Sequence, residues 1–371
     1  MSAVRQDSRS EIRWRHYACC SYLDPHDLFK DKVYSYENWQ RHRSWRRHFP
    51  EGLTCLQVFA WYWPPVAFVA LVGICVGLYA TLLQPRGAPI ITRDDYTVAF
   101  TITSFALALL LVFRTNTSYD RWWEARKMWG QMLNITRNLV RQVLTWGPPE
   151  QAELKKKVVR WTIAMVFALK AHLRRKRNMT QDLEDVLLPH ELAWLHKQPH
   201  FPVATTQVMS AAVRMLQVPD FQKVTIDQEI TNYHVNLAAC ERLFGQPIPV
   251  AYTRHTSRFL MTWASFLPFA LYNRYQWFTP AVAAIITFLL FGVENIGVQI
   301  EQPFDVLPLH TFCMAVKTSI EGMTKCQTEA FDILTQEPPL LAPEIVLAEH
   351  NGTKETVVNV GSVNGSVGPS S

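Results

Sequence analysis

An uncharged stretch of eighteen residues, Tyr96 to Phe113, limits what this chain can fold into more than any other feature of its sequence. As a helix rising ~1.5 Å per residue, it reaches roughly across the hydrocarbon core of a bilayer. Asp94 and Asp95 precede the stretch and Arg114 follows it, so both of its ends can lie in headgroups or water. The stretch therefore predicts a membrane-spanning helix.

Three bulky apolar residues, Phe105, Leu109 and Phe113, recur at four-residue steps along this helix. Residues four apart lie on the same helix face, so the three side chains form one apolar stripe. Where several copies of the helix surround an axis, such a stripe lines a pore. The alternative, on composition alone, is a stripe that packs on another helix or faces lipid.

Three further apolar stretches accompany the first: Gln57 to Leu83, Phe259 to Leu271, and Phe278 to about Ile300. The middle one is short and contains Pro268. The last one carries Glu294, whose charge inside a span is costly unless it is paired or hydrated. We prefer a structural partner for Glu294 over a role as an ion ligand. Four spans are expected, with both termini on one side of the membrane.

The distribution of basic residues predicts which side that is. Residues 114–178 carry fifteen Lys/Arg against four Asp/Glu, whereas the connection 84–95 has two Arg and two Asp. By the positive-inside rule, the termini and the long segment 114–258 lie in the cytosol or an equivalent compartment such as a chloroplast stroma. The basic runs 155–157 and 174–177 could attract nucleic acid or anionic lipid, but a solvated helix face is the usual explanation. No nucleic-acid partner is expected.

The chain divides into membrane and soluble parts. Apolar residues at helical spacing run through much of 114–258, with a helix break at Gly147-Pro148-Pro149, and neither strand alternation nor an internal repeat is evident. The expected organisation is a basic N-terminal arm at 1–56, two spans at 57–113, a helical soluble domain at 114–258, two spans at 259–300, a helical segment at 301–337 and a disordered tail at 338–371.

Catalytic and metal-binding motifs are missing from the sequence. The segment 190–194, HELAW, departs from the HExxH pattern, and Pro199 between His196 and His200 disfavours a helical zinc-binding face. No phosphate-binding loop, nucleophile elbow or pair of catalytic carboxylates is found. We therefore expect no enzyme, no metal site and no cofactor.

The segment 113–130, FRTNTSYDRWWEARKMWG, resembles the signature of the bestrophin family and of its relatives in plants, algae, fungi and bacteria. Weaker matches at 39–44, 248–253 and 294–304 follow in the expected order, so the resemblance covers roughly residues 30–330. It implies an all-α, bestrophin-like membrane protein with four transmembrane helices per subunit. It also implies a homopentamer around a central pore, surrounded by membrane lipid, through which inorganic anions pass, namely chloride and also bicarbonate or nitrate.

The resemblance also implies roles for particular residues. The membrane neck of the family falls on the apolar stripe, and Arg114 follows it at the pore mouth. The family also has a second, cytosolic constriction of the pore. Its position in this chain is assigned by ungapped sequence spacing alone. It falls near Val224, with Ile226 equally possible.

Calcium gating is not expected. Animal bestrophins bind calcium through a run of acidic residues just after a Pro-Phe element, whereas only Glu301 and Asp305 flank Pro303 and Phe304 here. These carboxylates are too few for a six- to eight-coordinate ion. The chain resembles the plant and algal branch of the family, which implies a chloroplast thylakoid membrane; the plasma membrane or another organelle membrane is the alternative.

A passive anion channel is the function that these observations favour. Large anions shed water at lower cost than small cations, and the edges of phenylalanine rings carry partial positive charge. The alternative is a non-conducting membrane scaffold whose basic soluble domain binds acidic partners or lipids. A membrane-bound enzyme is the weakest hypothesis.

Overall fold

The computed structural model describes residues 40, 43, 52–92, 96–174, 179–335, 347–350 and 353–356. The N-terminal arm expected at 1–56 therefore lies almost entirely outside the described residues. The chain forms two compact units, Met1–Ile320 and Glu321–Ser371. In the described part of the first unit, all regular secondary structure is helical.

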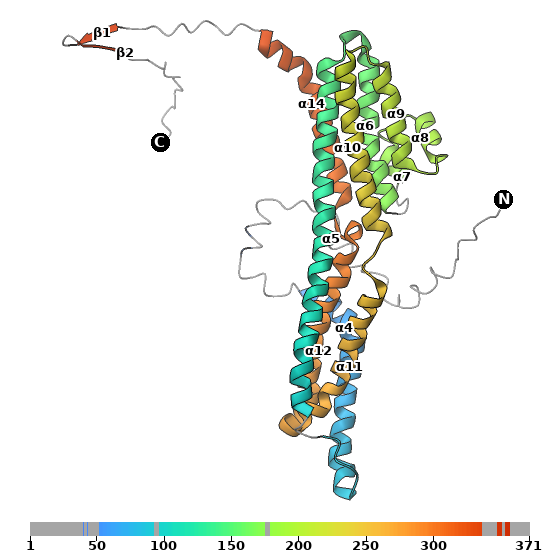
Figure 1. Cartoon of the computed structure of the whole chain (residues 1–371), viewed down its shortest axis with the longest axis vertical. Helices are drawn as coiled ribbons and strands as arrows, with labels where there is room; N and C mark the ends of the chain where they lie inside the picture. The colour runs from blue at the N-terminus through green and yellow to red at the C-terminus, as the bar shows by residue number, and fades with distance from the viewer. Residues whose placement is uncertain are drawn as a thin grey trace, which may run out of the picture. The chain divides into compact units, whose positions relative to one another are not determined.

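At one end of the first unit, an apolar bundle forms from three helices and the N-terminal part of a fourth (Figure 1). They are α4 (Gly52–Leu78), α5 (Tyr96–Trp146), α11 (Val250–Tyr275) and α12 (Thr279–Glu301). After α4 the chain widens into a single π-helical turn, η2 (Tyr79–Leu83), and then tightens into a 3-10 turn, η3 (Gln84–Arg86). It then turns at Gly87, whose φ of 91° suits glycine because this residue lacks a Cβ.

Small and branched side chains hold this apolar bundle together. Val69 of α4 packs against Ala264 and Leu267 of α11 and Ala283 of α12, and all four are buried. At Gly73 of α4, an added Cβ would lie 3.1 Å from the Cα of Pro280 in α12. The close approach of α4 and α12 therefore depends on a residue without a side chain.

Helix α5 is one uninterrupted helix of 51 residues, about 75 Å long at 1.5 Å per residue. It packs on α11 and α12 near its start and on α6 and α10 farther along (Figure 1). The boundary expected between residues 113 and 114 is therefore not a break in structure, because no proline or glycine falls between Tyr96 and Gly130. The helix ends just before Gly147 and Pro148, as the sequence predicts.

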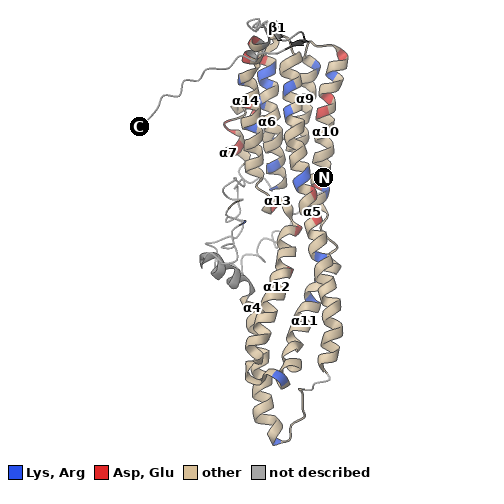
Figure 2. Cartoon of the chain, turned by 90° about the vertical axis from the view of Figure 1, so that its left-hand side faces the viewer, with Lys and Arg blue, Asp and Glu red and all other residues tan. Residues whose placement is uncertain are grey.

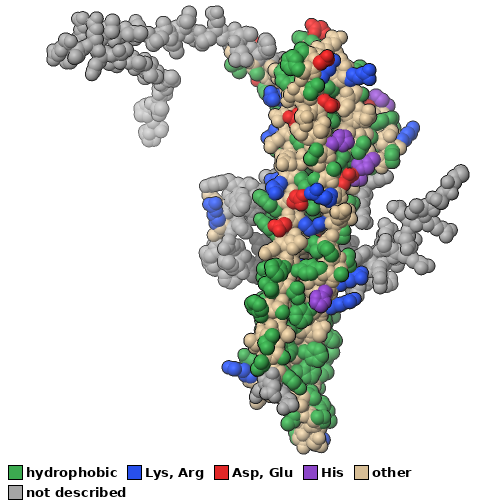
Figure 3. Space-filling view, viewed as in Figure 1, with side chains coloured by type: hydrophobic (Ala, Val, Ile, Leu, Met, Phe, Trp, Pro, Cys, Tyr) green, Lys and Arg blue, Asp and Glu red, His purple; other side chains and the backbone are tan. Residues whose placement is uncertain are grey.

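A second helical bundle occupies the other end of the first unit, where the charged residues gather (Figures 2 and 3). A 3-10 turn, η4 (Pro149–Gln151), leads into α6, whose residues from Trp161 to Ala171 are all buried. The helices of this bundle are α6 (Ala152–Leu173), α7 (Met179–Leu183), α8 (Pro189–His196), α9 (Phe201–Met215) and α10 (Asp220–Gly245).

Among the residues that the structure describes, three stretches are long and apolar enough to cross a membrane by length and composition: 63–86, 96–146 and 250–301. The last stretch contains both α11 and α12, which are separated by a 3-10 turn, η5 (Gln276–Phe278), where Gln276 has a φ of 45°. Helix α11 is also twice as long as the thirteen-residue span expected there, because its polar first half continues the helix back to Val250. Pro268 lies inside it without ending it.

The C-terminal region begins with α13 (Pro303–Val306) and continues as α14 (Leu309–Thr335). In the second unit, strands β1 (Leu347–His350) and β2 (Thr353–Thr356) pair antiparallel, with His350 opposite Thr353. This hairpin corrects the expectation of a wholly disordered tail. A local signal was present, since the intervening Asn351-Gly352 dipeptide is typical of two-residue hairpin connections.

Candidate pore-lining helix and the ion pair behind it

The apolar stripe is uncovered in the isolated chain. Phe105, Leu109 and Phe113 have exposed fractions of 74%, 43% and 54%. On the opposite face of α5, Leu107 and Leu111 are buried against α11 and α12. Successive residues are 100° apart on a helix, so positions two apart fall on nearly opposite faces. None of the described helices covers the stripe, and its role as the neck stays a prediction.

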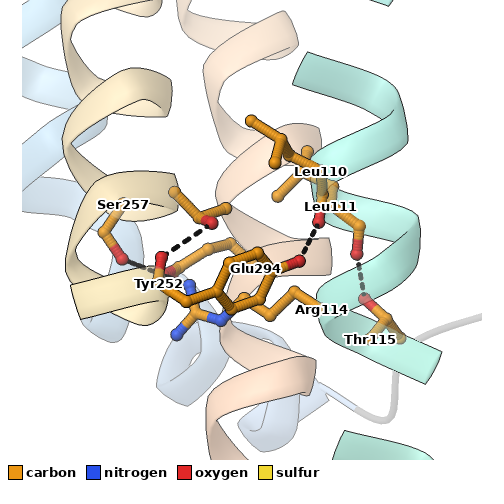
Figure 4. A network of polar contacts seen from close by, with 8 residues as sticks. Leu110, Leu111, Arg114, Thr115, Tyr252, Ser257 and Glu294 are labelled. Atoms are coloured by element: carbon orange, nitrogen blue, oxygen red, sulfur yellow. Dashed lines mark hydrogen bonds and ion pairs between the residues drawn. The ribbon is translucent and has the colours of Figure 1, made fainter. Parts of the chain in front are cut away.

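Arg114 is buried inside the bundle, although the sequence places it at the end of an apolar stretch; its position at a pore mouth stays a prediction. It continues the buried face of α5 formed by Leu107 and Leu111, and only 1% of it is exposed. Its Nη1 atom donates to Oε1 of Glu294 in α12 at 2.5 Å and to Oγ of Ser257 in α11 at 3.2 Å (Figure 4). The side chain points into the bundle because position 114 is seven residues, about two turns, after 107.

The Oε1 atom of Glu294 accepts two hydrogen bonds. Besides the guanidinium of Arg114, it accepts a hydrogen bond of 2.6 Å from Oγ of Ser257 (Figure 4). The structural partner preferred for Glu294 is therefore confirmed, and α5, α11 and α12 are joined by one polar network. The hydroxyl of Tyr252 extends it by donating to the backbone oxygen of Leu110 at 3.3 Å.

Two turns farther along α5, a second arginine binds the ends of two other helices. Arg121 of α5 donates to three backbone oxygens: Leu243 at 2.7 Å, Gln246 at 2.8 Å and Glu301 at 3.1 Å. Two of these carbonyls belong to the last turns of α10 and α12, which lack intrahelical partners. Glu124 of α5 pairs with Arg242 of α10 at 2.6 Å.

The two candidates for a second constriction differ in burial. Val224 is 68% exposed, whereas Ile226 is 0% exposed and lies in the core of its bundle. Positions two apart on α10 point to nearly opposite sides, and only the side of Val224 is uncovered. Val224 stays a prediction.

The guanidinium of Arg174 holds the backbone at and after the Pro-Phe element, Pro303-Phe304. Arg174 donates from Nη2 to the oxygen of Leu307 at 2.8 Å and from Nε to the oxygen of Phe304 at 3.3 Å. Nearby, the buried Lys170 pairs with Asp182 at 2.8 Å. The carbonyl oxygens of Phe304 and Leu307 therefore already accept hydrogen bonds from Arg174.

A cluster that the sequence did not reveal lies where α6, α9 and α10 meet. Nε2 of His172 and Nε2 of His200 lie 2.9 Å and 2.7 Å from the same oxygen, Oε1 of Glu241. The two imidazole rings are 4.5 Å apart between centroids. Burial lowers the pKa of His172, with the neighbouring His200 acting in the same direction and Glu241 opposing it. Next to the cluster, burial raises the pKa of the Cys240 thiol to about 12.

No local motif could have revealed this cluster, because its members come from three helices. His172 lies in the last turn of α6, and His200 is the N-cap of α9. In the sequence, the histidine near His200 is His196. Nε2 of His196 instead lies 3.1 Å from Oγ1 of Thr180.

Comparisons with known proteins agree on one family. The profile of a family described as "Bacterial/Fungal Bestrophin protein" matches residues 38–322. A protein of Arabidopsis thaliana named voltage-dependent chloride channel 1, chloroplastic, is 32% identical over 306 residues, which are 80% of this chain and 74% of that protein. A voltage-dependent anion channel-forming protein of Nostoc is 34% identical over 268 residues, or 69% of this chain and 84% of that protein.

The fold agrees as well. A crystal structure of a bacterial bestrophin homolog from Klebsiella pneumoniae superimposes with a TM-score of 0.64 at 25% sequence identity. The match covers 70% of this chain and 97% of that one. The likeness therefore extends over nearly the whole of the bacterial protein.

Proposed function

The chain belongs to the bestrophin family, and on that premise we propose that it forms a passive anion channel in which copies of α5 line a central pore. The observation that carries this proposal is the difference between the two faces of α5. Leu107, Leu111 and Arg114 are almost fully buried, while the apolar stripe beside them is exposed. Such an exposed face needs a covering of lipid or of other subunits, and a pentamer would turn it toward the axis.

The neck would be narrow, apolar and free of fixed charge. A ring of hydrophobic side chains conducts only when it is wet, and it passes ions that lose their hydration shell at low cost. Chloride and nitrate meet that condition better than small cations, and the edges of Phe105 and Phe113 would favour an anion. A hydroxyl group that would help to hydrate an anion lies near the neck, since Thr101 is exposed one turn before Phe105.

The membrane arrangement that we propose has four spans. It counts α11 and α12 separately, because the 3-10 turn η5 divides the apolar stretch between them. The basic residues of 114–178 would then face the cytosolic or stromal side and raise the local anion concentration at that end.

The membrane and the ion are inferred from relatives. Two Arabidopsis proteins that are 32% and 31% identical to this chain are named chloroplastic voltage-dependent chloride channels. A chloroplast thylakoid membrane and chloride, with bicarbonate or nitrate as further ions, are therefore our proposal for this chain.

Substitution in the neck tests the proposal. In planar bilayers, the Phe105→Ala/Phe113→Ala protein is expected to show several-fold higher conductance or a lower chloride-to-cation permeability ratio, because a wider neck is easier to wet. The matched control is Phe266→Ala/Phe278→Ala, which removes two phenylalanines of 57% and 76% exposure elsewhere in the apolar bundle.

The control is expected to conduct like the unaltered protein. Currents that are unchanged in the neck variant would overturn the assignment of the stripe. Purified protein that binds anionic liposomes but never conducts would favour the scaffold instead.

A further inference from the structure

We propose that His172, His200 and Glu241 form a binding site for a zinc ion, separate from the ion path. Two imidazole nitrogens and a carboxylate oxygen are a donor set that zinc prefers, with water filling a fourth position. Within the described ranges, this is the one group of three or more His, Cys, Asp or Glu residues whose donor atoms lie within 4.8 Å of one another.

The geometry needs only a small adjustment. The nitrogens of His172 and His200 now lie at hydrogen-bond distance, 2.9 Å and 2.7 Å, from Oε1 of Glu241. Zinc with bonds of about 2.0–2.1 Å holds its tetrahedral donors roughly 3.4 Å apart. The three side chains must therefore spread by about half an ångström, which small torsional changes supply.

The cluster is open enough for an ion to enter. The side chains of His172, His200 and Glu241 are 28%, 37% and 34% exposed. Their backbones are fixed by α6, α9 and α10, which pack against one another (Figure 1). A site with rigid anchors and partly exposed ligand atoms can exchange an ion with solvent and still hold its geometry.

Zinc binds a neutral imidazole through a ring nitrogen that carries no proton. His200 must change its tautomer, because its Nδ1 now accepts the backbone N–H of Val203 at 3.4 Å. At that length the hydrogen bond is weak, so little is lost when zinc binds Nε2 and the ring proton moves to Nδ1.

Zinc titration of the full-length protein in detergent tests the site. After treatment with a chelator, the protein is titrated with zinc chloride by calorimetry, and one saturable site per chain is expected. His172→Gln and His200→Gln should each weaken binding by at least about tenfold, since even residues that only support ligands cost that much. His190→Gln, which removes an exposed histidine of α8, should not weaken it.

A second measurement uses the unaltered protein alone. Zinc should slow the modification of His172 and His200 by diethyl pyrocarbonate, as read by peptide mass spectrometry, and leave that of His190 unchanged. This footprint decides the question where a variant fails to fold. The proposal would be overturned by the absence of a saturable site, by a zinc affinity in both glutamine variants equal to that of the unaltered protein, or by a footprint that omits both histidines.

Discussion

Removing one partner of the Arg114–Glu294 pair should destabilise the protein far more than removing both. The pair is almost enclosed, with 2% and 13% of the two side chains exposed. In such surroundings a charge without its partner keeps its desolvation penalty and loses its compensation. Glu294→Gln, which preserves the side-chain shape, isolates the effect of charge.

The expected magnitude follows from this burial. Breaking a buried ion pair costs about 3–5 kcal/mol, whereas replacing both members by apolar side chains is often close to neutral. We expect Glu294→Gln, Glu294→Leu and Arg114→Met each to lower the free energy of unfolding by about 3–5 kcal/mol, and the cycle combines the last two. The double variant Arg114→Met/Glu294→Leu should lie within about 1–2 kcal/mol of the unaltered protein.

The assay is a double-mutant cycle in mixed micelles, in which sodium dodecyl sulfate unfolds the protein and tryptophan fluorescence reports unfolding. Glu153→Gln is the control, because its pair with Lys156 leaves 79% and 67% of the side chains exposed and should contribute nothing measurable. The reasoning is refuted where the losses of the two single variants simply add in the double variant, since the two residues would then be energetically independent.

Two further predictions concern the helix bundles. Because burial lowers the pKa of His172, the folded state binds fewer protons than the unfolded state, and stability should fall as the pH drops below about 6.5, the ordinary histidine value. His172→Gln should flatten that part of a plot of stability against pH, whereas a steeper fall would show that Glu241 holds the proton on this ring. In the apolar bundle, Gly73→Ala should destabilise the protein by about 1 kcal/mol or more, because its Cβ would lie 3.1 Å from the Cα of Pro280. Gly292→Ala, with open space around it, should be neutral or slightly stabilising in the same thermal unfolding assay; equal losses at both sites would argue against the close approach.

Local patterns in the sequence were sufficient to predict the main helices and the family. The uncharged stretch 96–113 predicted a spanning helix, and Gly147 with Pro148 predicted its end, because hydrophobic periodicity and helix-breaking residues act over a few turns. The segment 113–130 carried the resemblance that the family profile confirms. The apolar stripe was also visible, since positions four apart share a helix face whatever the helix packs against.

Contacts between distant helices were not determined in this way. Arg114 stands at the end of an apolar stretch, where the sequence suggests a headgroup or a pore mouth, yet Glu294 lies 180 residues away and draws it into the bundle. The choice between Val224 and Ile226 likewise depended on which face of α10 is covered.

The histidine cluster shows the same limit most clearly. His172, His200 and Glu241 are separated by 28 and 41 residues, and no spacing rule links them, because their distances are set by how α6, α9 and α10 pack. The sequence by itself determined which segments are helices and which helix face is apolar. The tertiary structure alone decided which charged and ligating side chains meet, since the axial and rotational placement of one helix against another depends on the packing of the whole bundle.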